Sequence, residues 1–272
     1  MEKSNKKFSY ENLERLTTYW WFYLILFAGV FIPPYTAKGF STLSEIIPLV
    51  KYASEFIINK KLVLVPYMPA FHLVFFLSFL LLLIFENKFG RIFSVIAGVQ
   101  LTVIVYLQTF AVTEQHGLVF YPNAFAILAL IALGWFWEAW IRKTDFNFYR
   151  LPLKYYWVIP IAIFSFWNPD EIGNYSPSLL LTSTSPIAFC MSITIYLAAL
   201  SLLYPNVNLP LFRISSYFTI LVGITTVLMG VFMEDRVEGM YWSFLHTPML
   251  ITAVYCFILG FKTPEAKQMV LE

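Results

Sequence analysis

The sequence predicts an all-α polytopic bundle of membrane-spanning helices, and three observations support this fold class. The chain has 272 residues, of which 59% are hydrophobic and only 12% are charged, whereas a soluble domain is about one quarter charged. Apolar runs of about 20 residues, the length that a helix needs to cross a bilayer, recur along the chain. The alternating polarity of a membrane β-barrel is absent. A lipid bilayer is therefore the solvent that this composition fits.

Eight apolar segments are candidates for membrane spans. They cover residues 16–33, 62–85, 92–113, 117–141, 153–168, 185–204, 212–233 and 240–261. We expect helices here because no water in the hydrocarbon core could satisfy the backbone of an open chain. The fifth segment is the weakest, since it is short and has Pro160 in its middle, and a partly re-entrant path is an alternative for it. The whole chain, residues 1–272, is expected to form a single transmembrane domain.

The placement of positive charge predicts the orientation. If the N-terminus is cytoplasmic, thirteen of the eighteen Lys and Arg residues fall on the inner side, as the positive-inside rule requires. They are Lys3, Lys6, Lys7, Arg15, Lys88, Arg91, Arg142, Lys143, Arg150, Lys154, Arg213, Lys262 and Lys267. Both termini are then cytoplasmic in a multi-pass protein of the plasma membrane. Tryptophans near the segment ends, among them Trp20, Trp135 and Trp242, predict an interfacial belt.

A weak internal similarity suggests a parallel four-plus-four repeat, with halves 1–145 and 146–272. "RIFS" at 91–94 resembles "RISS" at 213–216, and in each half 26 residues lead from the arginine to a glycine, Gly117 or Gly239. Four spans per half would give both halves the same orientation. Chance is the alternative, because arginine at a helix end and glycine in a turn are both common.

Other segments allow narrower predictions. Apolar residues at helical spacing predict a helix on the outer membrane surface over residues 40–59, either as a packing element or as a lid. Glu138 lies four residues before Arg142, which predicts an ion pair at the inner interface rather than a proton relay. Gln100 and Gln108, two helical turns apart on roughly one face of the third span, could either bridge helices or line a pathway.

Prolines near the outer ends of the even-numbered spans mark the candidate site. Pro69, Pro122 and Pro186 are compatible with ordinary helix starts, and Ser185 is a candidate cap for the helix after it. Pro248 is instead expected to kink a helix that begins near Gly239. An ionisable residue inside a span, such as His246, is a functional candidate by default. We therefore predict an outward-facing polar vestibule with these candidate ligand-binding residues: His72, Asn123, Ser185, His246 and Thr247.

Short acidic turns are expected above this vestibule. Their residues are Glu114, His116, Asp170, Glu234, Asp235 and Glu238. A purely structural role is the alternative, because a turn between membrane helices must be polar, and acidic residues before a helix suit its positive N-terminal end.

Three functions fit these patterns, and the sequence favours a small-solute permease or a transporter component. It contains no G-x-x-x-x-G-K-[ST] phosphate loop, so energy would come from an ion gradient or a partner ATPase subunit. An alternative is an enzyme acting on a lipid at the outer face, with zinc held by the three histidines and Glu114 or Asp235, or with a haem between two histidines. No H-E-x-x-H or G-x-S-x-G motif supports it.

The third alternative is a non-catalytic sensor or complex subunit. The net charge of +2 is too small and too scattered for a nucleic-acid partner. The predicted partners are the lipid bilayer, a small-molecule solute or lipid, and a further subunit. The sequence assigns no catalytic residue, no metal-ligand set and no identified cofactor.

Overall fold

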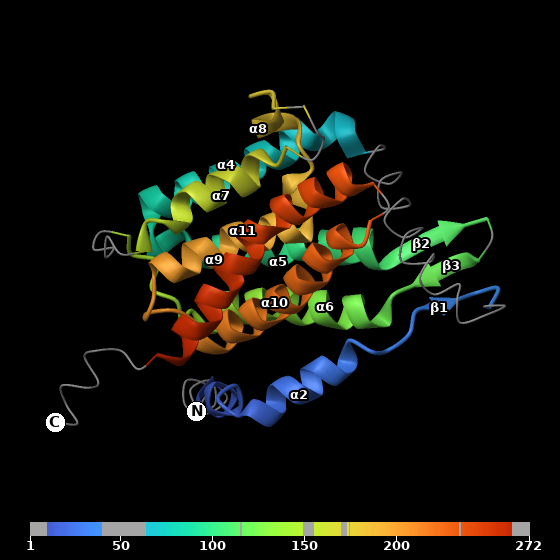
Figure 1. Cartoon of the computed structure of the whole chain (residues 1–272). Helices are drawn as coiled ribbons and strands as arrows, with labels where there is room; N and C mark the ends of the chain where they lie inside the picture. Colours follow the sequence, from blue (N-terminus) through green and yellow to red (C-terminus); the bar gives the residue numbers. More distant parts are fainter. Residues whose placement is uncertain are drawn as a thin grey trace.

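The fold is a bundle of antiparallel helices with a small sheet at one end (Figure 1). A computed structural model describes residues 10–39, 64–114, 116–148, 155–169, 173, 175–233 and 235–262. Its α-helices are α2 (Trp20–Gly29), α4 (Met68–Phe85), α5 (Asn87–Thr109), α6 (Pro122–Ile141), α7 (Val158–Trp167), α8 (Leu179–Thr182), α9 (Phe189–Leu202), α10 (Leu209–Val231) and α11 (Arg236–Phe261). Two 3-10 turns, η2 (Val65–Tyr67) and η4 (Ser185–Ile187), precede α4 and α9.

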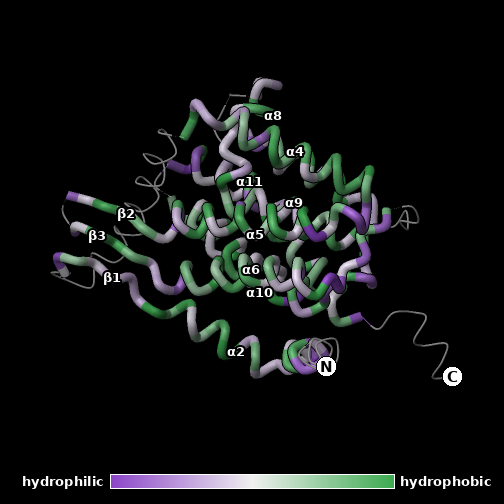
Figure 2. The backbone as a smooth tube through the Cα atoms, turned by 180° about the vertical axis from the view of Figure 1, so that it is seen from behind, coloured by the Kyte–Doolittle hydropathy of each residue, from purple (hydrophilic) through white to green (hydrophobic). Residues whose placement is uncertain are grey.

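The outer faces of the helices are apolar, as lipid exposure requires. On α4, His72 and Ser78 are buried, whereas Leu73, Val74 and Phe76 are more than half exposed. A water-soluble protein rarely exposes so much contiguous apolar surface. Hydrophobic colour runs along the helices, and hydrophilic residues gather near their ends (Figure 2). The molecule is therefore a polytopic membrane protein.

The described helices account for five or six crossings by length and composition. Val65–Phe85, Asn87–Thr109, Pro122–Ile141, Leu209–Val231 and Arg236–Phe261 are each long and apolar enough, and the bent segment Leu179–Leu202 would be the sixth. The remaining two predicted spans form helices α2 and α7 of 10 residues each. At 1.5 Å per residue each of these helices rises only about 15 Å, half the hydrocarbon thickness. The count of eight crossings thus stays a prediction.

The structure is consistent with the predicted all-α membrane bundle, but a small three-stranded antiparallel sheet corrects the bounds of two predicted spans. Strands β2 (Phe110–Thr113) and β3 (Gly117–Phe120) form a hairpin, and β1 (Tyr35–Thr36) adds to the free edge of β3. The ends of the third and fourth predicted spans are therefore strands that extend beyond the bundle (Figure 1). Gly117 has φ +66°, a conformation that glycine adopts without strain at the hairpin turn.

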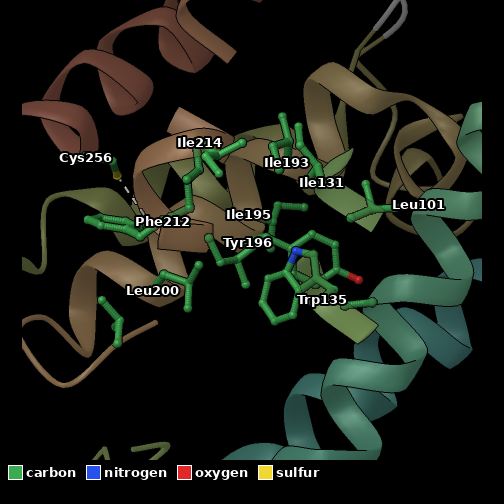
Figure 3. Packing of buried hydrophobic residues seen from close by; sticks show 14 of the residues in the cluster. Leu101, Ile131, Trp135, Ile193, Ile195, Tyr196, Leu200, Phe212, Ile214 and Cys256 are labelled. Atoms are coloured by element: carbon green, nitrogen blue, oxygen red, sulfur yellow. Dashed lines mark hydrogen bonds between the residues drawn. The ribbon is translucent and has the colours of Figure 1, made fainter. Parts of the chain in front are cut away.

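The core lies where α5, α6, α9, α10 and α11 meet, and it is built from large apolar side chains (Figure 3). Trp135 is only 1% exposed, and its ring lies 5.0 Å from that of Tyr196. The prediction that Trp135 belongs to an interfacial belt is therefore wrong. Trp20 is 73% exposed and Trp242 39% exposed, which is compatible with that belt.

The carboxylate of Glu138 joins α6 to α10, so the predicted ion pair with Arg142 is wrong. Its Oε1 accepts a hydrogen bond from the Thr144 backbone N–H at 2.8 Å, and its Oε2 accepts one from Asn208 Nδ2 at 2.7 Å. Arg142 adopts a left-handed conformation that ends α6, and its side chain is exposed. The Asn208 Oδ1 also caps α10 by accepting from the Leu211 N–H. We call this group the Glu138 junction.

Two of the three prolines interpreted as starts of membrane helices hold that position, and Pro248 lies inside a helix as expected. Pro69 and Pro122 lie in the first turns of α4 and α6. Pro186 instead lies in η4, where Ser185 caps no helix. Pro248 lies inside α11, which begins at Arg236, three residues before the predicted start at Gly239.

The positions that suggested a repeat have different local structures. Gly117 lies in a hairpin turn, whereas Gly239 lies in a helix and packs so closely that an added Cβ would be 2.1 Å from Gly230 O. Arg91 is exposed, whereas Arg213 is buried and donates to Gly260 O at 2.8 Å. The repeat of halves 1–145 and 146–272 stays a prediction, and the predicted surface helix over 40–59 lies outside the described residues.

Candidate functional site

The segment Leu179–Leu202 is the most irregular apolar stretch in the described bundle. Helix α8 and turn η4 meet α9 at an angle of 93°. Ser183 and Ala188 are both extended. Pro186 has no N–H to continue a helix, and the hydroxyls of the "TSTS" run at 182–185 compete with the backbone for hydrogen bonds. The local sequence therefore breaks the helix, and we refer to residues 183–188 as the break.

The break is buried inside the protein, and backbone carbonyls that make no helical hydrogen bond there are bonded to side chains instead. Ser183 is 2% exposed and Ser185 is 0% exposed. His72 Nε2 lies 2.8 Å from Ser183 O, Gln100 Nε2 donates to Pro186 O at 2.7 Å, and Ser192 Oγ donates to Ser185 O at 2.8 Å. Irregular backbone at membrane depth is tolerated only where such partners or a water-filled cavity exist. Side chains of α4, α5 and α9 thus stabilise the break.

The hydrogen bond to Ser183 sets the tautomer of His72. A carbonyl can only accept, so Nε2 carries the proton, and in the neutral ring Nδ1 is left as an acceptor. Nδ1 is buried together with the rest of the side chain, which is 0% exposed, and it has no hydrogen-bond partner among the described residues. The ring also packs edge-on against Phe166, with centroids 4.9 Å apart. A buried acceptor with no partner is uncommon and needs an explanation.

The C-terminal end of α7 forms the opposite wall. Phe166 O accepts from Ser185 Oγ at 2.8 Å and from Ser183 Oγ at 3.3 Å. Asn168 then ends the helix in a left-handed conformation, with φ 43°. Its Nδ2 donates to Thr184 Oγ1 at 3.4 Å, and its Oδ1 is a second buried acceptor without a partner.

Gln100 connects the break to the centre of the core. Its Nε2 also donates to Ser192 Oγ at 3.1 Å, while its Oε1 accepts from Tyr196 OH at 2.5 Å. Of the two roles left open for Gln100, bridging helices is therefore the one observed. Tyr196 is 1% exposed and lies against Trp135, whose Nε1 is a buried donor without a partner.

Two of the five predicted ligand-binding residues, His72 and Ser185, meet at the break. Asn123 does not, because its Nδ2 donates to Val30 O at 3.0 Å and so ties the first turn of α6 to the chain just after α2. His246 Nδ1 and Thr247 Oγ1 each form a hydrogen bond within α11, to Trp242 O and Ser243 O respectively, both at 2.8 Å.

The predicted acidic turns serve mainly local structure where they are described. Asp235 caps α11 by accepting from the N–H groups of Val237 and Glu238. Glu114 offers its backbone carbonyl to Lys38 Nζ at 2.6 Å, and His116 is buried in the hairpin turn. Asp170 and Glu234 lie outside the described residues.

Sequence reasoning did not select Gln100, Asn168 or Tyr196 as site residues, whereas the "TSTS" run at 182–185, which includes Ser183, was expected on the floor of the vestibule. Gln100 is an amide in an apolar helix, so it also carried a signal. Asn168 and Tyr196 carried none, because asparagine after a helix and tyrosine in a span are both common. Their place in the site depends on how α7 and α9 pack.

Neither metal chemistry nor homology assigns a role to this site. No cluster of three or more His, Cys, Asp or Glu residues that could hold a metal ion occurs within the described ranges. No protein-family model, curated protein or solved structure matches the chain. The function therefore has to be argued from the break itself.

Proposed function

We propose that this membrane protein is a permease, or the membrane-spanning component of a transporter, for a small polar solute that binds at the break. One observation carries the proposal. Irregular backbone inside the bundle carries two buried acceptors, His72 Nδ1 and Asn168 Oδ1, that no protein group uses. Many transporters bind their substrates at discontinuous helices within the membrane.

The chemistry of the break favours an uncharged solute that donates hydrogen bonds. The groups described around the break are serine and threonine hydroxyls, amides, an imidazole and backbone carbonyls. They include no charge that would offset the desolvation of an ion. Two unused acceptors are complementary to hydroxyl or amide N–H donors, as in a polyol or a urea-like molecule.

Transport would require the site to open. His72 and Ser185 are both 0% exposed, so the described state is closed. The 93° bend gives α8 and η4 a place at which to move as a unit relative to α9. Hinges of this kind are a few residues at the ends of elements that absorb the change in φ and ψ.

The variant His72→Gln tests the proposal in proteoliposomes. Glutamine keeps a donor near the position of Nε2, so the bond to Ser183 O is retained, but it offers no acceptor at the position of Nδ1. We expect solute uptake, screened over polyols and amides, to fall about tenfold, the value of one hydrogen bond at about 1.4 kcal/mol. The unfolding temperature should change little.

Thr247→Val is the matched control, because the Thr247 hydroxyl bonds within its own helix. Its uptake should equal that of the wild type. If no panel solute enters wild-type vesicles faster than empty ones, the transport proposal is wrong. Equal uptake by His72→Gln and the wild type would mean that the solute does not bind at the break.

A further inference from the structure

We infer that the end of the bundle opposite the sheet holds a binding site for an anionic phospholipid, between α5 and α6. The inference is independent of the transported solute. It rests on a polar cavity with unpaired cations and on an apolar groove that adjoins it.

The polar cavity has a volume of about 400 Å³ and lies where α5 begins and α6 ends. Its lining includes three cationic side chains, those of Arg91, Arg142 and Lys143. Neither arginine makes an ion pair with a carboxylate in the described part of the chain. Lys143 Nζ lies 4.8 Å from the centre of the Tyr10 ring. This is a cation–π contact, and it brings no negative charge to pair with the lysine.

The two acidic residues of the cavity, Glu138 and Asp145, already accept hydrogen bonds from other groups of the protein. Both Glu138 oxygens accept hydrogen bonds in the Glu138 junction. Asp145 Oδ1 accepts from Asn87 Nδ2 at 2.5 Å. These carboxylates reduce the net positive charge, but they do not pair with the arginine guanidinium groups, which remain able to bind a phosphate. Arginine suits this role because its planar fork matches phosphate oxygens.

An apolar groove of about 320 Å³ shares Arg91 with the cavity. It is lined by Val95 of α5 and by Phe136, Ala139 and Trp140 of α6. Val95 and Phe136 are 39% and 36% exposed on the lipid-facing surface. The Phe136 ring lies across Gly98, where an added Cβ would be 2.9 Å away. An acyl chain can pack in such an apolar groove, whereas a free phosphate would make no favourable contact with it.

The position of the site along the helices agrees with this occupant. Arg91, Arg142 and Trp140 lie at helix ends, where a bilayer places its phosphates and where tryptophan is enriched. The sequence predicts that this end is cytoplasmic, and basic pockets between helices on that side bind anionic headgroups. Charge complementarity and the adjoining groove together select an anionic phospholipid.

The test measures thermal unfolding of the full-length protein in dodecyl maltoside micelles. Dioleoyl phosphatidylglycerol should raise the unfolding temperature more than dioleoyl phosphatidylcholine. Arg91→Gln and Arg142→Gln should each weaken the apparent affinity for phosphatidylglycerol about tenfold, as expected for one charged hydrogen bond. Lys88→Gln is the matched control, because Lys88 is exposed at the same end but does not line the cavity. Its affinity should stay within about twofold of the wild type.

Glycerol phosphate and inorganic phosphate separate the sources of the anion. Both should stabilise the protein far less than the lipid does. If inorganic phosphate stabilised the protein as much as phosphatidylglycerol does, the cavity would be a site for free anions and not for a lipid. An equal loss in Lys88→Gln would show only diffuse surface attraction, and no preference for phosphatidylglycerol over phosphatidylcholine in the wild type would overturn the inference.

Discussion

The break and the Glu138 junction are both buried polar networks in a membrane bundle, but they differ in how completely they are satisfied. In the junction each carboxylate oxygen has a donor, and Asn208 uses both ends of its amide. At the break, His72 Nδ1 and Asn168 Oδ1 have no protein partner. A fully paired network stabilises one structure, whereas unpaired buried groups are costly unless they serve another purpose. This difference is the reason for treating the Glu138 junction as structural and for proposing that a ligand binds at the break.

Asn208→Ala should have the largest effect, since it leaves Glu138 Oε2 without a donor and removes the cap of α10. A buried acceptor left without its donor costs about 1–3 kcal/mol, and a lost cap adds about 1 kcal/mol. Chemical unfolding in detergent would measure the loss. Glu238→Gln, on the exposed first turn of α11, is the control and should stay within about 0.5 kcal/mol of the wild type. Equal stabilities of the two variants would mean that the junction is not structural.

Gln100→Leu should have an intermediate effect on stability. Leucine leaves Pro186 O and Tyr196 OH without their Gln100 partner in apolar surroundings. Hydrogen bonds between membrane helices contribute about 1–2 kcal/mol in model systems, so the free energy of unfolding should fall by about that amount. Gln108→Leu, in the same helix, provides the comparison. A larger loss in Gln108→Leu than in Gln100→Leu would contradict the assignment of Gln100 as the bridge to the break.

Single cysteine substitutions should change the free energy of unfolding least, and their reactivity should differ most clearly between the two ends of the bundle. In a background without Cys190 and Cys256, single cysteines would replace Ser185 and, as the control, the exposed Lys88 at the end predicted to be cytoplasmic. A membrane-impermeant thiol reagent added outside, together with the transported solute, should modify position 185 as the break opens. Position 88 should stay unmodified from that side. If position 185 never reacts under any transport condition, the outward-facing vestibule is wrong.

Helix formation and lipid exposure were predictable because they depend on local composition. A run of about 20 apolar residues in lipid has no partner for its backbone groups except itself, so α4, α5, α6, α10 and α11 follow directly. The hairpin was not predictable in this way. Its short apolar runs are compatible with either helix or strand, and its third strand comes from Tyr35–Thr36, far away in the chain.

The candidate site was predictable only in part. The proline and the hydroxyl run at 182–186 identified the region of the break, and His72 was conspicuous as a histidine inside a span. Which acceptors remain unpaired depends on the distances between α4, α7 and α9. The same limit explains the wrong partner for Glu138, since Asn208 lies 70 residues further along the chain.

The sequence by itself determined that the solvent is lipid, which segments of the chain form most of the helices, and which residues are too polar for their surroundings. Only the tertiary structure decided which of those polar residues pair with one another. The physical reason is that backbone hydrogen bonding in lipid is satisfied within each helix, whereas buried side chains are satisfied by residues that packing brings together.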